Sequence, residues 1–327
     1  MRILIIEMSN LGDALLTYPA LHALWRAYPD GEFHLLASPR NAELFLNDPR
    51  VKEVRIWDKK AGPLRQLQMV RDLSRERFDW VVDFRNSLVP FFLPGAKRTP
   101  LFGRSSRNGT HRAQAHMDLV TALGVPPYTG AMRLPFESEE EQEVAKWLEP
   151  GKRTVLIVPG ARSHLKRWPL EKFAAVADRL VEKHQAQVLL VGEEAEQPIA
   201  EQVRRLMKQP AVNLAGRGSI RQLAALLAQT QLVVTNDSAC LHAAEVMGVP
   251  SVAIFGPTDE RKYGPRNPRS AVVRLKLRCA PCEKALCRYG THECMRDLAV
   301  DDVYSAAVKV LETSVRAEPV EARIGKA

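Results

Sequence analysis

The sequence predicts an α/β protein of two doubly wound, Rossmann-like domains in series. The chain has 327 residues, more than one ordinary hydrophobic core holds, which indicates two domains of roughly 150 residues. Short apolar runs alternate with amphipathic helical stretches, as in a parallel sheet covered by helices. The same alternation restarts after an acidic, proline-containing segment at 135–151. We therefore expect domains at 1–150 and 151–312, followed by a charged, disordered tail at 313–327.

Hydrophobic periodicity places the individual elements. In the first half, buried-strand patterns occur at 2–6, 33–37, 54–57 and 80–84, and helical patterns at 14–28, 64–77 and 113–123. Residues 93–112 form a basic, loop-rich stretch without a clear period. In the second half, strands are expected at 154–158, 187–191, 232–235 and 251–255, and helices at 169–184, at 193–207 and around residue 242.

Composition limits the classes of partner that the protein is expected to bind. A hydrophobic content of 46% and a charged content of 26% are typical of a soluble globular protein. The formal charge of +9 favours an acidic partner: nucleic acid, anionic lipid or a phosphorylated substrate. Aromatic residues are only 6% and no nucleic-acid module is recognisable, which argues against nucleic acid. No apolar run approaches the ~18 residues of a membrane span. Glu7 interrupts the amino-terminal apolar run, so we expect a cytoplasmic protein without a signal peptide.

Two common nucleotide motifs are not supported. After Gly216 and Gly218, Arg221 stands where a dinucleotide fingerprint needs its third glycine. The stretch from Gly160 to Lys166 lacks the second glycine and the hydroxyl residue of a P-loop. A nicotinamide oxidoreductase and a P-loop NTPase are therefore disfavoured.

The segment 232–259 is the centre of the predicted site. A β-branched run is followed by Asp237 and Ser238, and His242 comes about one turn later. This order puts polar side chains and free helix N–H groups at the carboxyl end of a strand, where open α/β sheets bind anionic ligands. The structural alternative is that Asp237 only caps the helix.

A second polar loop, Ser9–Asp13, follows the first predicted strand. Gly12 allows a ligand to approach the backbone, and Asp13 stands where the strand gives way to the helix. Asp13 is either an ordinary N-cap or a carboxylate available as a general base.

These motifs together resemble glycosyltransferase family 9, the bacterial heptosyltransferases of lipopolysaccharide core synthesis. The resemblance rests on Ser9-x-x-Gly12-Asp13, Lys166-Arg167-Trp168-Pro169, Asp237-Ser238-x-x-x-His242, and Phe255-Gly256-Pro257-Thr258-Asp259. It runs in order from residue 1 to about residue 311. Within the family, Asp83–Ser87, the basic loop after it and the cysteine-bearing tail are most similar to the type II heptosyltransferases.

The resemblance implies a GT-B fold, two Rossmann-like domains facing across a cleft, and inverting, metal-independent transfer of heptose from ADP-heptose to a hydroxyl of the lipopolysaccharide inner core. The first domain would be the acceptor side and carry the base, Asp13, and the second would bind the nucleotide sugar. The implied donor-binding residues are Ser9, Asn10, Gly12, Lys166, Glu196, Asp237, Ser238 and His242. Ser9 and Lys166 would contact the diphosphate, Glu196 the nucleoside and Asp237 the sugar hydroxyls. No cofactor is implied.

The residue types agree with that chemistry. No two aspartates have the DxD spacing of a metal-dependent transferase, so Lys166 and helix N–H groups would stabilise the departing diphosphate. An alcohol is a poor nucleophile at neutral pH and needs a base. The alternatives are another nucleotide-sugar enzyme of the same fold, such as an epimerase or a different transferase, and a non-catalytic nucleotide-sugar binding protein.

A phosphorylated lipid A-core acceptor and the anionic inner membrane surface are the expected further partners, with the protein cytoplasmic or peripheral on that surface. The candidate acceptor-binding residues are Arg85, Asn86, Ser87, Arg104, Arg107 and His111. The structural alternative is an ordinary solvated basic loop.

Four cysteines near the end of the chain form a compact cluster: Cys279, Cys282, Cys287 and Cys294. In a cytoplasmic protein such a cluster favours metal ligation over disulfides. The spacing has neither the paired knuckles of a zinc ribbon nor a common iron–sulfur pattern. A structural metal, reduced thiols and facultative disulfides all stay open. Cys240 is expected to be a small core residue.

Overall fold

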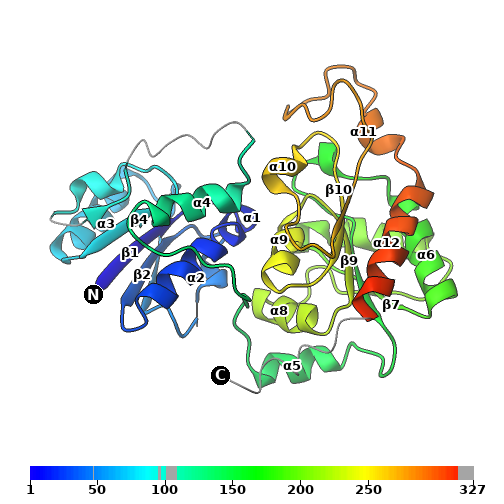
Figure 1. Ribbon diagram of the computed structural model, residues 1–327, viewed down its shortest axis with the longest axis horizontal. Coiled ribbons are helices and arrows are strands. Elements are labelled where there is room, and N and C mark those ends of the chain that lie inside the picture. Colours follow the sequence, from blue (N-terminus) through cyan, green and yellow to red (C-terminus); the bar gives the residue numbers. More distant parts are fainter. Residues whose placement is uncertain (47, 95–96, 101–108, 316–327) are drawn as a thin grey trace. The chain divides into compact units, whose positions relative to one another are not determined.

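A computed structural model of the protein describes residues 1–46, 48–94, 97–100 and 109–315. The chain divides into two compact units, Met1–Pro135 and Phe136–Ala327. Each unit has a parallel sheet with helices packed on it (Figure 1). The predicted fold class, two doubly wound α/β units, is confirmed. In the described part of the chain, no helix combines the length and apolar character needed to cross a bilayer.

The sheet of the first unit has the order β3-β2-β1-β4-β5, and every neighbouring pair is parallel. Its strands are β1 (Arg2–Glu7), β2 (Glu32–Ala37), β3 (Glu53–Ile56), β4 (Trp80–Asp83) and β5 (Lys97–Arg98). β1 is the central strand, with Ile5 opposite Leu35 on one side and Val82 on the other. Both faces of β1 are covered, so its apolar residues run consecutively rather than alternating.

Helices of this unit lie on both faces of the sheet (Figure 1). They are α1 (Leu11–Leu15), α2 (Tyr18–Ala27), α3 (Pro63–Arg75) and α4 (Arg112–Thr121), with 3-10 turns η1 (Ala42–Leu44) and η2 (Val89–Phe92). Leu73 of α3 packs on Leu4 and Ile6 of β1. The strand order reverses after β3, so right-handed crossovers put α3 on the face opposite α2.

The prediction of a single helix at 14–28 is wrong in one respect, because the structure has two helices there. α1 begins at Leu11 and ends at Leu15, and α2 begins at Tyr18. Pro19 has no N–H to donate to the preceding turn, and its fixed φ suits the first turn of a new helix. The Thr17 hydroxyl instead donates to the Ala14 carbonyl at 2.6 Å.

The sheet of the second unit has the order β11-β10-β9-β6-β7-β8, again parallel throughout. Its strands are β6 (Thr154–Val158), β7 (Gln187–Leu190), β8 (Val212–Asn213), β9 (Leu232–Asn236), β10 (Ser251–Ile254) and β11 (Ala271–Val273). The longer helices are α5 (Ser138–Ala145), α6 (Leu170–His184), α7 (Gln197–Leu206), α8 (Ile220–Ala228), α9 (Ala239–Val246) and α12 (Val300–Val315). Shorter turns are η3 (His164–Lys166), η4 (Glu194–Glu196), α10 (Glu260–Tyr263) and α11 (Glu293–Arg296).

The core of the second unit lies under α6, α7 and α12. Phe173 of α6, Val203 of α7 and Val303 of α12 are fully buried against Ile157 and Val234 of the central strands. In Figure 1, α12 runs beside α6 at one side of the sheet. On the other side, Leu241 of α9 packs on Phe255, which follows β10. These layers fix the carboxyl ends of β6, β7, β9 and β10 along one edge.

The division between the units lies earlier than the expected boundary after residue 150. Helix α5 packs against α8 of the second unit, and the Arg221 Nε atom lies 2.6 Å from a Glu140 oxygen. This ion pair ties the acidic segment to the second unit, so the chain divides after Pro135. Helix α12 continues to Val315, and residues 316–327 of the expected tail lie outside the described residues.

Candidate active site

The Ser9–Asp13 loop is fixed by the loop that follows β2. The Ser38 hydroxyl donates to the Ser9 carbonyl at 2.6 Å, and the Asn41 side-chain amide donates to the Glu7 carbonyl at 3.0 Å. Arg40 also donates to the Asn10 side-chain oxygen at 3.1 Å. Neighbouring parallel strands end at the same edge, so the β2 loop can position the β1 loop in this way.

Glu7 is a buried acid that hydrogen-bonds to this loop, and the sequence analysis assigned it no role in the site. Its side chain is 1% exposed at the end of β1, and one of its carboxylate oxygens accepts hydrogen bonds from the Ser9 hydroxyl and, at 3.0 Å, the Ser9 N–H. Burial raises the pKa of the Glu7 carboxyl to about 7, although these hydrogen bonds and the charge of Arg85 act in the opposite direction. The nearby carboxylate of Asp13 raises this pKa further. The signal in the sequence was a charged residue inside a buried strand.

Asp13 lies in the first turn of α1 and is half-buried. Asn10, not Asp13, occupies the N-cap position, and neither side chain makes a capping hydrogen bond. The Asp13 carboxylate forms no hydrogen bond or ion pair with any residue that the structure describes. The N-cap alternative for Asp13 is therefore wrong, and its lone pairs stay available to a ligand. Gly12 is helical, so its backbone conformation does not require glycine.

The turn after β4 is built by Asp83, which is 3% exposed. Its carboxylate accepts the Arg85 N–H at 2.8 Å, the Ser87 N–H at 2.6 Å and the Ser87 hydroxyl at 2.8 Å. Asn86 between them has a positive φ of 51°, which asparagine tolerates better than most residues. The Ser87 hydroxyl is therefore engaged within the turn, whereas the Arg85 side chain is exposed.

Several cations of the first unit gather around His116. Burial, followed by the charges of Arg112, Arg85 and His111, lowers the pKa of His116 to about 4. The His111 ring accepts the Ala113 N–H at 3.2 Å and so caps α4, a structural contribution that we did not predict. The expected acceptor residues Arg104 and Arg107 lie outside the described residues.

In the second unit, Lys166, Asp237 and His242 come together at the carboxyl edge of the sheet. The Lys166 ammonium lies 2.6 Å from one oxygen of Asp237, and the His242 Nε2 atom lies 4.0 Å from the other. Asp237 is only 6% exposed, whereas the Lys166 side chain is 30% exposed. The cation therefore reaches from the solvent to a buried carboxylate. A ligand phosphate can contact the ammonium from its open side.

Asn236 holds this group of residues in place. Its side-chain oxygen accepts the Trp168 N–H at 3.1 Å, and its side-chain nitrogen donates to the carbonyls of Pro159 at 2.8 Å and Gly160 at 3.3 Å. Asn236 is fully buried at the end of β9. One side chain thus joins the loops after β6 and β9, the two loops that carry Lys166 and Asp237.

Glu196 lies beside the backbone of Gly160 and Gly192. A β-carbon at either position would clash with the Glu196 side chain, at 2.9 Å from a carboxylate oxygen for Gly192 and closer for Gly160. Burial raises the pKa of Glu196, and its carboxylate accepts the Glu193 N–H at 3.0 Å. The two glycines thus let this acid approach the ends of β6 and β7.

The remaining polar residues of this edge have local partners. The Ser238 hydroxyl lies 2.9 Å from that of Thr235, and Ser238 occupies the N-cap position of α9 without a side-chain cap. Asp259 accepts the Arg261 N–H at 3.0 Å and pairs with its guanidinium, so it caps α10. The Thr258 hydroxyl is buried and has no hydrogen-bond partner among the described residues. Cys240 is buried in the core of the unit, as predicted.

The four clustered cysteines line one pocket together with His292. None is in a disulfide. Backbone N–H groups of residues 289–292 hold the pKa of the Cys287 thiol below its ordinary value. Burial, followed by the charges of the other three thiols, raises the pKa of Cys294 to about 11.

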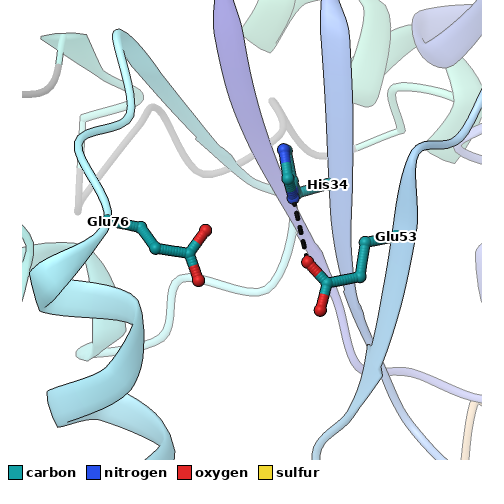
Figure 2. Close-up of side chains that lie close together, drawn as sticks. All are labelled: His34, Glu53 and Glu76. Atoms are coloured by element: carbon teal, nitrogen blue, oxygen red, sulfur yellow. Dashed lines mark hydrogen bonds and ion pairs between the residues drawn. The ribbon is translucent and has the colours of Figure 1, made fainter.

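A third group, His34, Glu53 and Glu76, has ligand types that could hold a metal ion (Figure 2). The His34 Nδ1 atom lies 3.2 Å from a Glu53 oxygen. Arg2 pairs with Glu76 at 2.8 Å, and Arg55 pairs with both glutamates. These arginines already neutralise the carboxylates, which makes the group an ion-pair network at the sheet edge.

Comparison with known proteins identifies the family. The family model described as glycosyltransferase family 9 (heptosyltransferase) matches residues 66–292. The chain belongs to glycosyltransferase family 9. It is 28% identical over 323 residues to lipooligosaccharide heptosyltransferase 2 of Campylobacter jejuni, covering 96% of this chain and 99% of that protein. The family predicted from the sequence is therefore confirmed, as is its glycosyltransferase class.

Solved structures agree on the fold. Superposition on the E. coli ADP-heptose lipopolysaccharide heptosyltransferase II gives a TM-score of 0.78 at 22% identity, covering 96% of this chain and all of that one (100%). A glycosyl transferase family 9 protein from Veillonella parvula gives 0.78 at 21% identity, covering 95% and 97%. Two Rossmann-like units are what the GT-B resemblance implied.

Proposed function

We propose that this glycosyltransferase moves heptose from ADP-heptose to a hydroxyl of the lipopolysaccharide inner core, with inversion and without a metal ion. The observation that carries the proposal is the Lys166–Asp237–His242 group at the carboxyl edge of the second sheet. It offers a cation for a diphosphate next to a carboxylate for sugar hydroxyls. Two of the proteins named above are heptosyltransferases, and the name of the E. coli enzyme includes ADP-heptose.

In the proposed reaction, the Asp13 carboxylate removes the proton of the acceptor hydroxyl. The oxygen attacks the anomeric carbon as the bond to the diphosphate breaks, so the configuration inverts and ADP departs. The further negative charge that develops on the diphosphate as ADP departs needs stabilisation that a metal provides in other transferases. Lys166 and the N–H groups at the start of α9 supply it here, a preorganised electrostatic effect worth several kcal/mol. Glu196 contacts the nucleoside, with Ser9 at the diphosphate.

The acceptor is proposed to be a phosphorylated lipid A-core saccharide. Arg85 is exposed and lies near Glu7, which precedes the Ser9–Asp13 loop. Arg85, Arg112 and His111 also all lie near His116. Guanidinium groups bind phosphate with paired hydrogen bonds. Arg85→Glu should weaken acceptor binding and reduce its salt dependence while leaving ADP affinity unchanged. Unchanged acceptor affinity would remove Arg85 from this role.

We also propose that the first unit rests on an anionic membrane surface. α3 and η2 contact each other and expose apolar side chains: Leu64, Leu67, Leu88, Phe91 and Phe92. Leu67 is 66% exposed and Phe92 is 61% exposed. Lys59 and Arg85 line the same pocket as Phe92, so apolar and cationic groups occupy one surface, as in interfacial binding. Vesicles of phosphatidylglycerol should sediment the protein, and the Leu67→Ser/Phe92→Ser variant should stay in solution. Equal sedimentation of both would contradict the proposal.

Donor specificity tests the main proposal. Thermal melts should show ADP-heptose and ADP raising Tm, with UDP-glucose and GDP-mannose having little effect, because only bound ligands stabilise the native state. Lys166→Met should reduce the ADP-dependent shift. Half-buried Lys172→Met is a matched control, because the hydrogen bonds of this lysine go to the carbonyls of Arg296 and Leu298 among the described residues. A larger shift with a uridine nucleotide would refute the assignment.

A further inference from the structure

The pocket of the first unit that Phe92 lines is a cavity of about 370 Å³ at the carboxyl edge of the sheet. Met8 after β1, Trp57 after β3 and Ser87 after β4 all line it, together with residues of α3 and η2. Its volume is in the range of small-ligand sites, ~300–1,000 Å³. Open α/β sheets bind ligands at this edge. The pocket is therefore a candidate ligand site of the first unit.

The wall of this pocket is mainly apolar. Its apolar members are Met8, Trp57, Val70, Leu88, Val89 and Phe92. Met8 and Val89 are buried and belong to the core on which α3 packs, and Trp57 and Val70 pack against that core from outside. The floor of the pocket is thus continuous with the hydrophobic core of the unit.

The pocket offers few neutral groups that could bind sugar hydroxyls. Among the described residues that line it, Ser87 is the one with a hydroxyl or amide side chain, and the Trp57 indole adds a single N–H. The Ser87 hydroxyl already donates to Asp83 at 2.8 Å and lies 3.4 Å from the Val89 N–H. A saccharide would lose hydrogen bonds to water here without gaining replacements, which is costly. The lining therefore favours a hydrocarbon chain over a sugar.

Two cations complete the wall. Lys59 and Arg85 line the pocket and are exposed. In the part of the chain that the structure describes, neither side chain forms a hydrogen bond or ion pair with a carboxylate. Ammonium and guanidinium groups bind phosphate through charge-assisted hydrogen bonds. A molecule with an apolar chain and a phosphate at one end would complement both parts of the pocket.

We propose that this pocket binds one acyl chain of an anionic membrane lipid, with the phosphate of the lipid head group on Lys59 and Arg85. Leu88 and Phe92 line the pocket and are 64% and 61% exposed. Exposed apolar side chains of the proposed membrane surface are therefore part of its wall. Covering them with a hydrocarbon chain removes apolar surface from water, which favours binding. The first unit thus holds a single lipid in addition to resting on the bilayer.

The consequence for the reaction rests on the proposed function. Met8 lines the pocket and immediately precedes Ser9, so a bound chain contacts the strand end from which the loop with Asp13 begins. A lipid held there would keep this unit at the bilayer that carries the acceptor. The pocket itself does not depend on heptose transfer, and its test uses neither donor nor acceptor.

Binding of monomeric amphiphiles to the full chain tests the proposal. Dodecyl phosphate, kept below its micelle concentration, should saturate a single site in calorimetry and change the fluorescence of Trp57. Dodecyl maltoside has the same chain without the charge, and glucose 1-phosphate has the charge without the chain. Each should bind at least about 10-fold more weakly, because each satisfies only part of the pocket. Lysophosphatidylglycerol, a membrane lipid with one chain, should displace dodecyl phosphate.

Substitutions locate the site. Lys59→Met should weaken dodecyl phosphate binding by about 10-fold and leave dodecyl maltoside binding unchanged. Lys60→Met is the matched control, because it removes the same charge from an exposed neighbour that does not line the pocket. Val70→Phe should fill the pocket and weaken the binding of both amphiphiles, whereas Leu67→Phe, at an exposed position of the same helix, should not. Trp57→Phe should abolish the fluorescence change.

Four results separate the proposal from its alternatives. Equal binding of dodecyl phosphate by wild type, Lys59→Met and Val70→Phe would overturn it. Glucose 1-phosphate that binds as tightly as dodecyl phosphate would show a sugar-phosphate site instead. Binding to phosphatidylglycerol vesicles without binding of any monomeric amphiphile would show that the surface only rests on the bilayer. A protein that binds dodecyl phosphate as expected but transfers no heptose would contradict the proposed function and support the lipid site.

Discussion

Replacing the buried carboxyl of Glu7 by an amide should change how the stability of the protein depends on pH. Glu7→Gln keeps the size of the side chain and an oxygen that can accept from Ser9. It removes a group whose pKa burial raises from the ordinary 4.5 to about 7. At 1.36 kcal/mol for each pH unit, that rise corresponds to about 3 kcal/mol.

The sign follows from proton binding. Below pH 4.5 the carboxyl is protonated in both the folded and the unfolded chain, and its ionisation costs nothing. Between pH 4.5 and 7 the unfolded chain ionises first, so the wild-type protein loses stability as pH rises. Above pH 7 the buried carboxylate is charged, and the loss of about 3 kcal/mol is complete.

Urea unfolding at several pH values between 4.5 and 8 measures this effect. The free energy of unfolding of Glu7→Gln minus that of wild type should increase by about 3 kcal/mol across this range, mostly below pH 7. Glu43→Gln removes one charge from an exposed glutamate of the same unit and controls for net charge. A difference that stays constant with pH would refute the assignment of a raised pKa to Glu7.

Three further predictions concern the proposed site. Asp13→Asn should lower kcat by about 100-fold or more and leave the Kd for ADP unchanged, because the proposed role of Asp13 is that of a base and the residue is not a cap. Turnover assays measure kcat and calorimetry measures the Kd, and a fully active variant would exclude this base. Lys166→Met should lower the free energy of unfolding by about 2 kcal/mol, because it leaves buried Asp237 without its cation. Adding Asp237→Asn should recover part of this loss. If urea unfolding shows that the losses of the two single variants simply add, the pair is not coupled. Gly160→Ala should weaken ADP binding with little change in Tm, because the new methyl group displaces only the flexible end of Glu196. An unchanged Kd for ADP in calorimetry would show that Glu196 does not contact the nucleoside.

The central strands of both sheets could be predicted from the sequence, because strands buried on both faces are continuous apolar runs. The short edge strands β5, β8 and β11 have two or three residues each and are partly exposed. Hydrogen bonds to a neighbouring strand define them, and no local pattern marks such pairing. The domain boundary depended on the contact between Arg221 and Glu140, residues that lie far apart in the sequence.

The sequence indicates candidate residues for the site but not the contacts that they make. Lys166 and Asp237 were recognised separately, and their 2.6 Å contact joins positions 71 residues apart. The Asn236 side chain joins two loops, a role that its local sequence does not indicate. Glu7 was noticed only as an interruption of an apolar run. In each case the role arises from tertiary neighbours that local sequence does not specify.

Heptose transfer itself tests the central claim most directly. The purified protein is incubated with ADP-heptose and a lipid A-core acceptor that carries one heptose fewer than the product, and the saccharide is analysed by mass spectrometry while ADP release is followed. We expect the acceptor to gain one heptose for each ADP released, and to do so in the presence of a chelator. The configuration of the anomeric carbon in the product should be the inverse of that in ADP-heptose. An acceptor that stays unmodified while ADP-heptose binds, or one that gains a sugar only from a uridine nucleotide, would contradict this account.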